Sequence, residues 1–206
     1  MSLIADAVSF AYDDDHEVLR NVSLSVDPRE RVALVAPSGR GKTTLCRILA
    51  GYLSGYQGSV TVDGVDISLM PRRQARPVQL IWQHPEQAFD PRMRMQRSLQ
   101  EAGFDLHDPH CSELAERFGL NSAWFMRYPG ELSGGELMRF CLVRALCTNP
   151  RYLICDEISA MLDVVTQAQI WHELIDISSA CNMGLLIVSH VPALLDRVAT
   201  STVDLA

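Results

Sequence analysis

One stretch of this chain decides the fold: Ala36-Pro37-Ser38-Gly39-Arg40-Gly41-Lys42-Thr43. It follows a short apolar run, Arg31–Ala36, which is typical of a buried strand, and it precedes a helical pattern over Thr43–Ala50. A turn of this composition binds phosphate, because its backbone N–H groups and the positive end of the helix dipole face the anion. The lysine reaches the terminal phosphates and the hydroxyl beside it binds Mg²⁺. The stretch therefore predicts an α/β protein with a triphosphate site.

Ala36 departs from the usual phosphate-loop pattern, which begins with glycine. The substitution removes one position at which a positive φ would be free of strain. Gly39 and Gly41 remain, so the backbone is still able to approach phosphates closely. A chance glycine-rich turn before a helix is the alternative. The strand before the turn, the helix after it and the intact run Gly41–Thr44 favour the phosphate site.

Strand patterns lie towards both ends of the chain, and a helical region lies between them. Besides Arg31–Ala36, the expected strands are Leu3–Phe10, Asn21–Val26, Ser59–Val62, Val78–Trp82, Tyr152–Cys155 and Gly184–Ser189. Helices are expected over Glu136–Leu146 and Gln167–Ser178. The middle, from about His84 to Cys147, has helical periodicity interrupted by prolines. This order predicts an α/β core with an inserted helical subdomain.

Composition narrows the class of protein. A chain of 206 residues fits one compact domain, and its net charge of −7 argues against a general nucleic-acid binder. No apolar run approaches the roughly 20 residues of a membrane span, and the first residues do not form a secretory signal. The six cysteines form no Cys-x-x-Cys pair, which suits reduced thiols in a cytosolic protein.

Two carboxylates follow the expected strand Tyr152–Cys155. Asp156 at the strand end is able to hold Mg²⁺ through water, beside the phosphate loop. Because adjacent strand residues face opposite ways, Glu157 would point elsewhere, toward a water aligned on the γ-phosphate, as general base. A solvated strand end is the alternative explanation for such a pair.

Two further polar residues follow core strands. His190 comes after Leu185–Val188 and Ser189, and its imidazole is able to donate to a γ-phosphate. Gln83 ends the strand Val78–Trp82 and is able to coordinate Mg²⁺ or position a water. A structural histidine and a polar loop residue are the alternatives.

The stretch Leu132-Ser133-Gly134-Gly135-Glu136 comes just before a helix and forms a second anion-binding end. The phosphate loop, Gln83, this stretch, the acidic pair and His190 follow one another along the chain in this order, and together they closely resemble the ABC ATPases; the resemblance covers essentially the whole chain. The resemblance implies the P-loop NTPase (RecA-like) fold, a mixed sheet core with an N-terminal antiparallel β part and an inserted helical subdomain.

The resemblance also implies roles for single residues. Tyr12 matches the aromatic residue that stacks on adenine, Asp156 matches Walker B, Glu157 the catalytic base, Gln83 the Q-loop and His190 the switch histidine. Walker A is matched by Ser38, Gly39, Arg40, Gly41, Lys42, Thr43 and Thr44, with Mg²⁺ held by Thr43, Gln83 and Asp156. The signature is matched by Ser133, Gly134, Gly135 and Glu136. The D-loop, Ser159–Asp163, is altered, although Asp163 is kept.

As an ABC ATPase, the chain would be one domain over 1–206, with a nucleotide-binding core at 1–84 and 149–206 and a signature subdomain at 85–148. Its cofactors would be ATP and Mg²⁺. Two such subunits, identical or different, would sandwich two nucleotides head to tail, because the signature of one subunit completes the ATP site of the other.

Three stretches look like the peptide and nickel import ATPases: Gln83–Met93, Arg127–Glu131 and Leu162–Ile170. The implied partners are transmembrane permease subunits and a solute-binding protein, with the chain in the cytoplasm, peripheral on the inner face of the membrane. After His190 the chain continues only to Ala206, where those proteins extend further, so the importer role stays open. The alternatives are a soluble ABC-type ATPase coupled to a non-transport process and, given Ala36, a binding subunit without turnover. No nucleic-acid partner is expected.

Overall fold

The structure is a computed structural model, and it describes residues 1–13, 17–70, 75–159 and 162–205. The chain divides into two compact units. The first consists of Met1–Leu80, Arg151–Glu157 and Ser178–Ala206, and the second of Ile81–Pro150 and Ile158–Ile177.

The first unit contains an antiparallel sheet built mainly from the N-terminal part of the chain. Its strand order is β2-β1-β4-β5, from β1 (Leu3–Ala11), β2 (Glu17–Val26), β4 (Gln57–Val62) and β5 (Val65–Asp66). Buried and exposed residues largely alternate along β1, as expected for a sheet with only one face on the core. This is the antiparallel β part that the sequence predicts.

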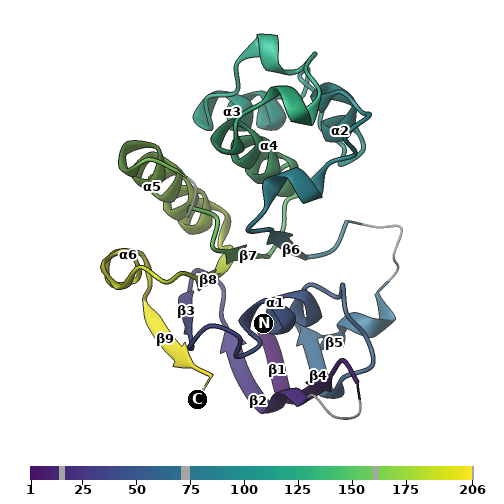
Figure 1. The fold of residues 1–206 in the computed structure, drawn as a ribbon, viewed down its shortest axis with the longest axis vertical. Coiled ribbons are helices and arrows are strands. Elements are labelled where there is room, and N and C mark those ends of the chain that lie inside the picture. Colours follow the sequence, from purple (N-terminus) through teal and green to yellow (C-terminus); the bar gives the residue numbers. More distant parts are fainter. Residues whose placement is uncertain (14–16, 71–74, 160–161, 206) are drawn as a thin grey trace. The chain divides into compact units, whose positions relative to one another are not determined.

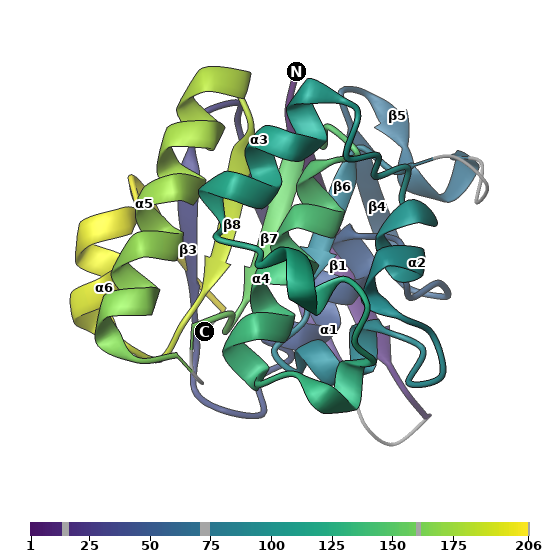
Figure 2. The ribbon, with the colours of Figure 1, turned by 90° about the horizontal axis from the view of Figure 1, so that it is seen from above.

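A second sheet of the first unit has the strand order β6-β7-β8-β3-β9. Its strands are β6 (Val78–Ile81), β7 (Tyr152–Asp156), β8 (Gly184–Val188), β3 (Arg31–Val35) and β9 (Ser201–Asp204). Strand β3 pairs in parallel with β8 and β9. Strands β7 and β8 also pair in parallel and lie side by side in Figure 2. Every residue of β7 and β8 is buried, which explains their continuous apolar runs.

The register of this parallel sheet brings three loops to one edge. Val188 pairs with both Leu34 and Asp156, so β3, β7 and β8 end at the same level. The loops after these strands carry the phosphate-loop sequence, Glu157 and His190, respectively. In open α/β sheets, ligands bind at the carboxyl ends of parallel strands.

Helix α1 (Lys42–Leu49) lies between the two sheets and contacts β2 and β7 (Figure 1). Its Leu45, Ile48 and Leu49 are completely buried. Helix α6 (Pro192–Val198) connects β8 to β9. The phosphate-loop helix is therefore packed on two sides, which holds its N-terminus in place.

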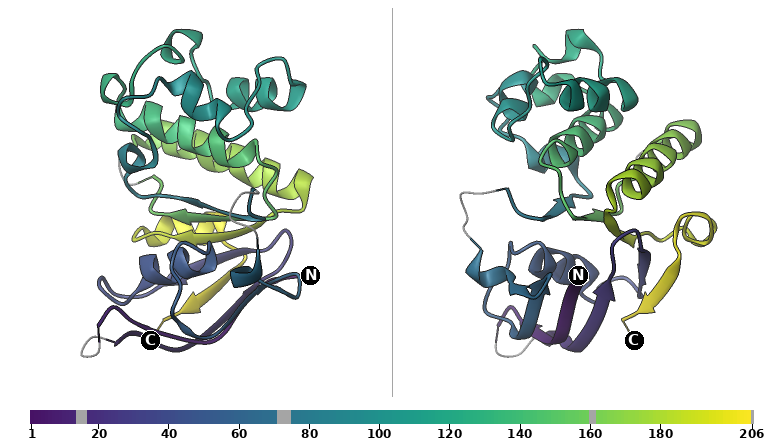
Figure 3. Two further views of the ribbon diagram at one scale, coloured as in Figure 1. Left: turned by 90° about the vertical axis from the view of Figure 1, so that its right-hand side faces the viewer. Right: turned by 180° about the vertical axis from the view of Figure 1, so that it is seen from behind.

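The second unit is helical (Figures 1 and 3). It contains η2 (Pro85–Ala88), α2 (Met95–Gln100), α3 (Pro109–Arg117), η3 (Ser122–Trp124), η4 (Pro129–Glu131), α4 (Gly134–Leu146) and most of α5 (Val164–Cys181). Its core includes Leu99 and Phe140, both fully buried, and Phe125 packs edge-on against Phe140 with ring centroids 5.5 Å apart.

The fold class predicted from the sequence is confirmed, and several details differ. Pro109 and Pro129 start α3 and η4 rather than interrupting helices, since proline is tolerated in the first turn, where its missing N–H has no partner anyway. The helix expected over Gln167–Ser178 begins earlier, at Val164. Strand β9 and helix α6 were not predicted. None of the helices formed by the described residues is both long and apolar enough to cross a bilayer.

Candidate active site

The phosphate loop owes its shape to two glycines in the left-handed region. Gly39 has φ 80° and Gly41, the residue that precedes α1, has φ 81°. A Cβ at position 41 would lie 2.7 Å from Leu19 Cδ2 and 2.9 Å from Val18 Cγ1, both on β2. Position 41 therefore requires glycine for its backbone conformation and for the close approach of β2.

Ala36 causes no strain where the usual pattern has glycine. It is absent from the non-glycine residues with positive φ found in the described chain. The conformation at this position is one that any L-residue adopts. The sequence-based concern about Ala36 therefore has no basis in the backbone.

The Lys42 side chain folds back onto the start of the phosphate loop. Its side chain is buried, and Nζ donates hydrogen bonds to the carbonyl oxygens of Ala36 at 2.7 Å and Pro37 at 3.2 Å. Ala36 and Pro37 thus contribute carbonyls that hold the ammonium group at the start of α1, where an anion would bind.

A cavity of about 450 Å³ opens at this loop. Most of its lining residues were predicted as site residues: Tyr12, Ser38, Gly39, Gly41, Lys42, Thr43, Thr44, Glu157 and His190. Val18 of β2 also lines it and was not predicted, because a single valine in a strand carries no chemical signal. Arg40 instead lines a separate cavity of about 360 Å³ with Glu17, Arg20 and Leu205 among others.

Tyr12 lines the cavity, and both its hydroxyl and its ring make contacts that fix the side chain. Its hydroxyl and that of Thr44 in α1 form a hydrogen bond of 3.2 Å, and its ring packs edge-on against Phe10 with centroids 4.9 Å apart. The side chain is otherwise exposed. An aromatic ring held in this way offers a face for stacking on a flat ligand.

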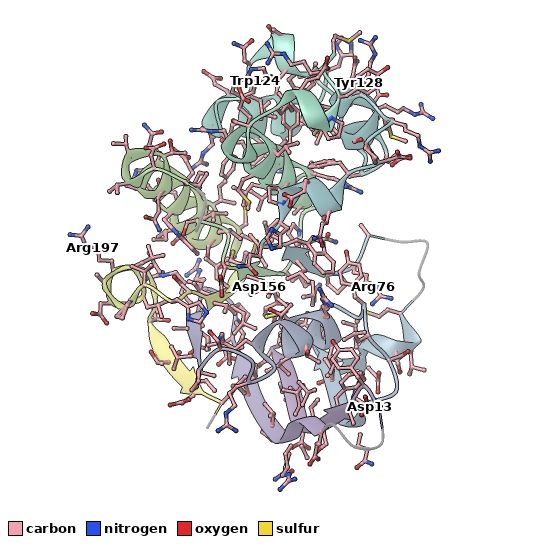
Figure 4. The ribbon with its side chains drawn as sticks, viewed as in Figure 1. Asp13, Arg76, Trp124, Tyr128, Asp156 and Arg197 are labelled. Carbon is pink, nitrogen blue, oxygen red and sulfur yellow. The ribbon has the colours of Figure 1, made fainter. Side chains whose placement is uncertain are left out.

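Asp156, the last residue of β7, has a buried side chain. Figure 4 labels it. Burial raises its pKa above the ordinary value, and a hydrogen bond from the Thr43 side chain opposes that rise. Its Oδ1 is buried and has no hydrogen-bond partner among the described residues. A hydroxyl and a carboxylate with an unused oxygen fit Mg²⁺, which prefers oxygen ligands.

Glu157 leaves the strand in a strained conformation. Its φ is 54°, in the left-handed region that disfavours a residue with a side chain, and its N–H donates to the carbonyl of Val188 at 3.0 Å. Strand alternation, from which the sequence predicts the orientation of Glu157, does not set it, because β7 has already ended at Asp156. Such strain persists only where the surrounding structure enforces it, and functional sites are common places for it.

His190 and Glu157 are in direct contact. His190 Nε2 lies 2.8 Å from Glu157 Oε1, and Glu157 is the more buried of the two side chains. Both line the cavity that contains Lys42 and Thr43. The arrangement places a carboxylate and an imidazole, in contact with each other, in the cavity that the phosphate-loop residues line.

The signature residues form the N-terminus of α4 in the second unit. The Ser133 hydroxyl accepts from the N–H of Glu136 at 3.3 Å, and the Glu136 carboxylate accepts from the N–H of Ser133 at 2.7 Å. The latter bond holds the pKa of Glu136 below its ordinary value. A Cβ on Gly135 would lie 3.2 Å from Leu162 Cδ2. This reciprocal capping stabilises a helix end of the kind that binds anions.

The remaining predicted residues also belong to the second unit. Asp163 caps α5, because its carboxylate accepts from the N–H groups of Val165 and Thr166 and from the Thr166 hydroxyl. These bonds from Thr166 lower its pKa. Gln83 lies between β6 and η2. Of the expected D-loop, Ala160 and Met161 lie outside the described residues.

Comparison with known proteins identifies a family. The family model described as "ABC transporter" matches residues 19–160. The Glutathione import ATP-binding protein GsiA of Salmonella typhimurium is 33% identical over 192 residues, which cover 88% of this chain and 31% of that protein. The "Putative peptide import ATP-binding protein" of Brucella abortus is 35% identical over 193 residues, which cover 86% of this chain and 57% of that protein. The chain thus spans between about a third and somewhat over half of these relatives.

Solved structures agree on the fold. The dimeric post-hydrolysis structure of the ATP-binding cassette MJ0796 bound to ADP and Pi has a TM-score of 0.83 at 20% identity, covering 99% of this chain and 94% of that one. An ATP binding subunit of an ABC transporter has a TM-score of 0.84 at 23% identity, covering 99% and 85%.

Proposed function

Because this chain belongs to the ABC transporter family, we propose that it binds and hydrolyses MgATP and thereby energises an importer for peptides or related small solutes. The observation that carries the proposal is the cavity that brings Tyr12, the phosphate loop and the Glu157–His190 pair together. The names of the Salmonella and Brucella relatives support the importer role and its substrate class.

The loop would hold the triphosphate. The backbone N–H groups of Gly39 to Thr43 and the dipole of α1 favour phosphate, and Lys42 would exchange its carbonyl partners for phosphate oxygens. Tyr12 would stack on the adenine. Thr43, Asp156 and Gln83 would supply oxygens to Mg²⁺, which when bound offsets the negative charge of the phosphates.

Glu157 would accept a proton from the attacking water. Without nucleotide, His190 Nε2–H would donate to Glu157 Oε1, which orients the carboxylate, and with ATP bound the same N–H would donate to the γ-phosphate instead. Gln83 would respond to the same phosphate. We propose these roles for Glu157, His190 and Gln83 because each residue matches a position of the ABC ATPase motifs.

A second ATPase subunit, identical or different, would complete the site with its signature. Ser133, Gly134 and Gly135 at the start of α4 would bind the partner's nucleotide, and Asp163 would communicate between the sites. We propose that 85–148 acts as the signature subdomain of a single ATPase domain. The working complex would include permease subunits and a solute-binding protein, placing the chain in the cytoplasm on the inner face of the membrane.

Reconstitution tests this role. The chain is purified together with peptide-importer permease subunits from the same organism and placed in liposomes with a peptide-binding solute-binding protein. Peptide-stimulated ATP hydrolysis and uptake, both abolished by Lys42→Ala, are expected. If the rate of ATP hydrolysis does not change when permease subunits or solute are added, the soluble, non-transport ATPase is favoured instead.

A further inference from the structure

The segment that follows Gln83 is attached to α4 by contacts within the second unit. Arg144 Nη1, on α4, donates a hydrogen bond to the carbonyl of Ala88 at the end of η2. The Arg144 guanidinium also lies over the ring of buried Phe89, 5.4 Å from its centroid. Arg144 therefore contacts two consecutive residues: it hydrogen-bonds to the backbone of Ala88 and makes a cation–π contact with the ring of Phe89.

A third contact lies about one turn earlier on the same helix. The buried Cys141 thiol points to the carbonyl of Pro85, with Sγ 3.9 Å from the oxygen. The segment is itself compact, because the N–H of Gln87 donates to the carbonyl of His84 at 3.1 Å. Both ends of η2 are thus held against α4.

Helix α4 links this attachment to the signature. It is a continuous helix of 13 residues whose first turn carries Gly134 and Gly135 and whose last turn carries Arg144. A helix of this length moves as a rigid element on the scale of a conformational change. A displacement of Gln83 would pass through η2 to Arg144 and along α4 to Ser133.

We propose that Arg144 is a positioning residue that makes Gln83 and the signature end of α4 move as one body. The proposal rests on the proposed function, in which Gln83 responds to the γ-phosphate of its own subunit and the signature binds the nucleotide of the partner. Arg144 would then transmit the state of one ATP site to the helix end that closes the other. Lysine would replace it only in part, because an ammonium lacks the planar fork that combines a hydrogen bond with ring stacking.

The chain offers a matched control on the same helix. Arg139 also lies on α4 and also donates to a backbone carbonyl, that of Phe118 at the end of α3, at 2.7 Å. Arg139→Ala removes an equivalent side chain and an equivalent bond without touching the segment after Gln83. A difference between the two variants therefore reports the attachment and not a general loss of helix stability.

The attachment is tested with a tryptophan reporter. Trp82 precedes Gln83, and in a Trp124→Phe/Trp171→Phe background it is the only tryptophan of the three. In Arg144→Ala we expect acrylamide quenching of Trp82 to rise about twofold, because the segment is released, with a smaller rise in Arg144→Lys and none in Arg139→Ala. Equal quenching in Arg144→Ala and Arg139→Ala overturns the attachment, whether or not the chain hydrolyses ATP.

The functional consequence is tested by kinetics. Arg144→Ala is expected to lower kcat by about tenfold with an unchanged KM for MgATP, and the double variant with Gln83→Ala to be no slower than Gln83→Ala alone. Arg144→Lys keeps the charge, and its kcat is expected to lie between those of the wild type and Arg144→Ala. It also provides a usable variant if Arg144→Ala does not fold. Additive losses, or an equal loss in Arg139→Ala, overturn the proposal. A wild-type chain that hydrolyses no ATP either alone or together with its partner ATPase subunit overturns the proposed function instead, while the Trp82 result still stands.

Discussion

His190 Nε2 lies 2.8 Å from Glu157 Oε1, across the ends of two neighbouring parallel strands. Strand pairing of Asp156 with Val188 sets this distance, because Glu157 and His190 follow those residues closely. Glu157 also takes a left-handed backbone conformation, and its N–H is bonded to the carbonyl of Val188. The carboxylate is therefore oriented by the sheet, by the histidine and by a strained turn.

The first prediction concerns this carboxylate. Glu157→Gln keeps the size of the side chain and removes the base, so we expect MgATP hydrolysis to fall by about 100-fold or more while ATP affinity stays the same. Steady-state phosphate release and equilibrium ATP binding measure the two quantities. Glu116→Gln, on an exposed face of α3, is the control. Undiminished hydrolysis in Glu157→Gln would remove Glu157 from the role of base.

Ala36→Gly tests whether the unusual residue of the phosphate loop limits activity. Since the φ of Ala36 is not positive, glycine relieves no strain and only adds conformational freedom to the unfolded chain. We expect unchanged ATP affinity and a loss of about 0.4–1 kcal/mol in the free energy of unfolding. Urea denaturation and ATP titration provide the values. A large gain in affinity would mean that alanine does hinder the loop.

Gly41→Ala and Gly39→Ala form a matched pair, because both glycines have φ near 80°. A Cβ at 41 would overlap with Leu19 and Val18, whereas a Cβ at 39 would have no heavy atom of the described residues within 4 Å, apart from those of its chain neighbours. Both substitutions strain the backbone, and only Gly41→Ala also displaces β2 from α1. We expect a clearly lower melting temperature for Gly41→Ala than for Gly39→Ala. Equal melting temperatures would contradict the close packing at Gly41.

Asp156→Asn tests how much the buried, charged carboxylate of Asp156 lowers the free energy of unfolding. Burial raises the pKa of Asp156, so the folded chain binds this proton more tightly than the unfolded chain does. The contribution of Asp156 to stability is therefore most favourable at low pH and is lost as the pH rises from the ordinary pKa through the raised one. Without nucleotide, Asn at this position should raise the melting temperature at neutral pH by about 2 °C or more.

The gain from Asp156→Asn should shrink as the pH falls, because a growing fraction of the native carboxyl is then protonated. Magnesium-dependent ATP hydrolysis should be lost, because the carboxylate that we propose as a Mg²⁺ ligand is gone. Thermal melting from pH 4 to 8 with and without MgATP measures all three effects. A variant that is less stable than wild type at neutral pH would contradict the account.

The fold was largely predictable from the sequence, because buried parallel strands, the phosphate loop and the helical middle each leave a local pattern. Strand β7 is an example: its apolar run and the acid that ends it are both local. Strand β9 was missed, because it is short and half-exposed and is held by pairing with β3, far away in the sequence. The start of α5 was also missed, although Asp163 followed by Thr166 is a capping signal.

The sequence predicted which residues form the site, but it did not predict the contacts that they make with one another. The positions of Lys42, Asp156 and His190, each just after an expected buried strand, indicated which side chains could meet at one sheet edge. The sequence could not reveal that Glu157 adopts a positive φ, that Val18 lines the cavity or that Arg144 grips Ala88 and Phe89. These features arise from tertiary packing, which leaves no periodic or compositional signal in the chain.

The central claim is that the cavity at the phosphate loop is a nucleotide site, and calorimetric titration of the purified chain with MgATP tests it most directly. We expect saturable binding of one nucleotide per chain, weakened by at least about tenfold in Lys42→Ala. Absence of binding by a folded wild-type chain, or equal affinity in Lys42→Ala, would contradict it.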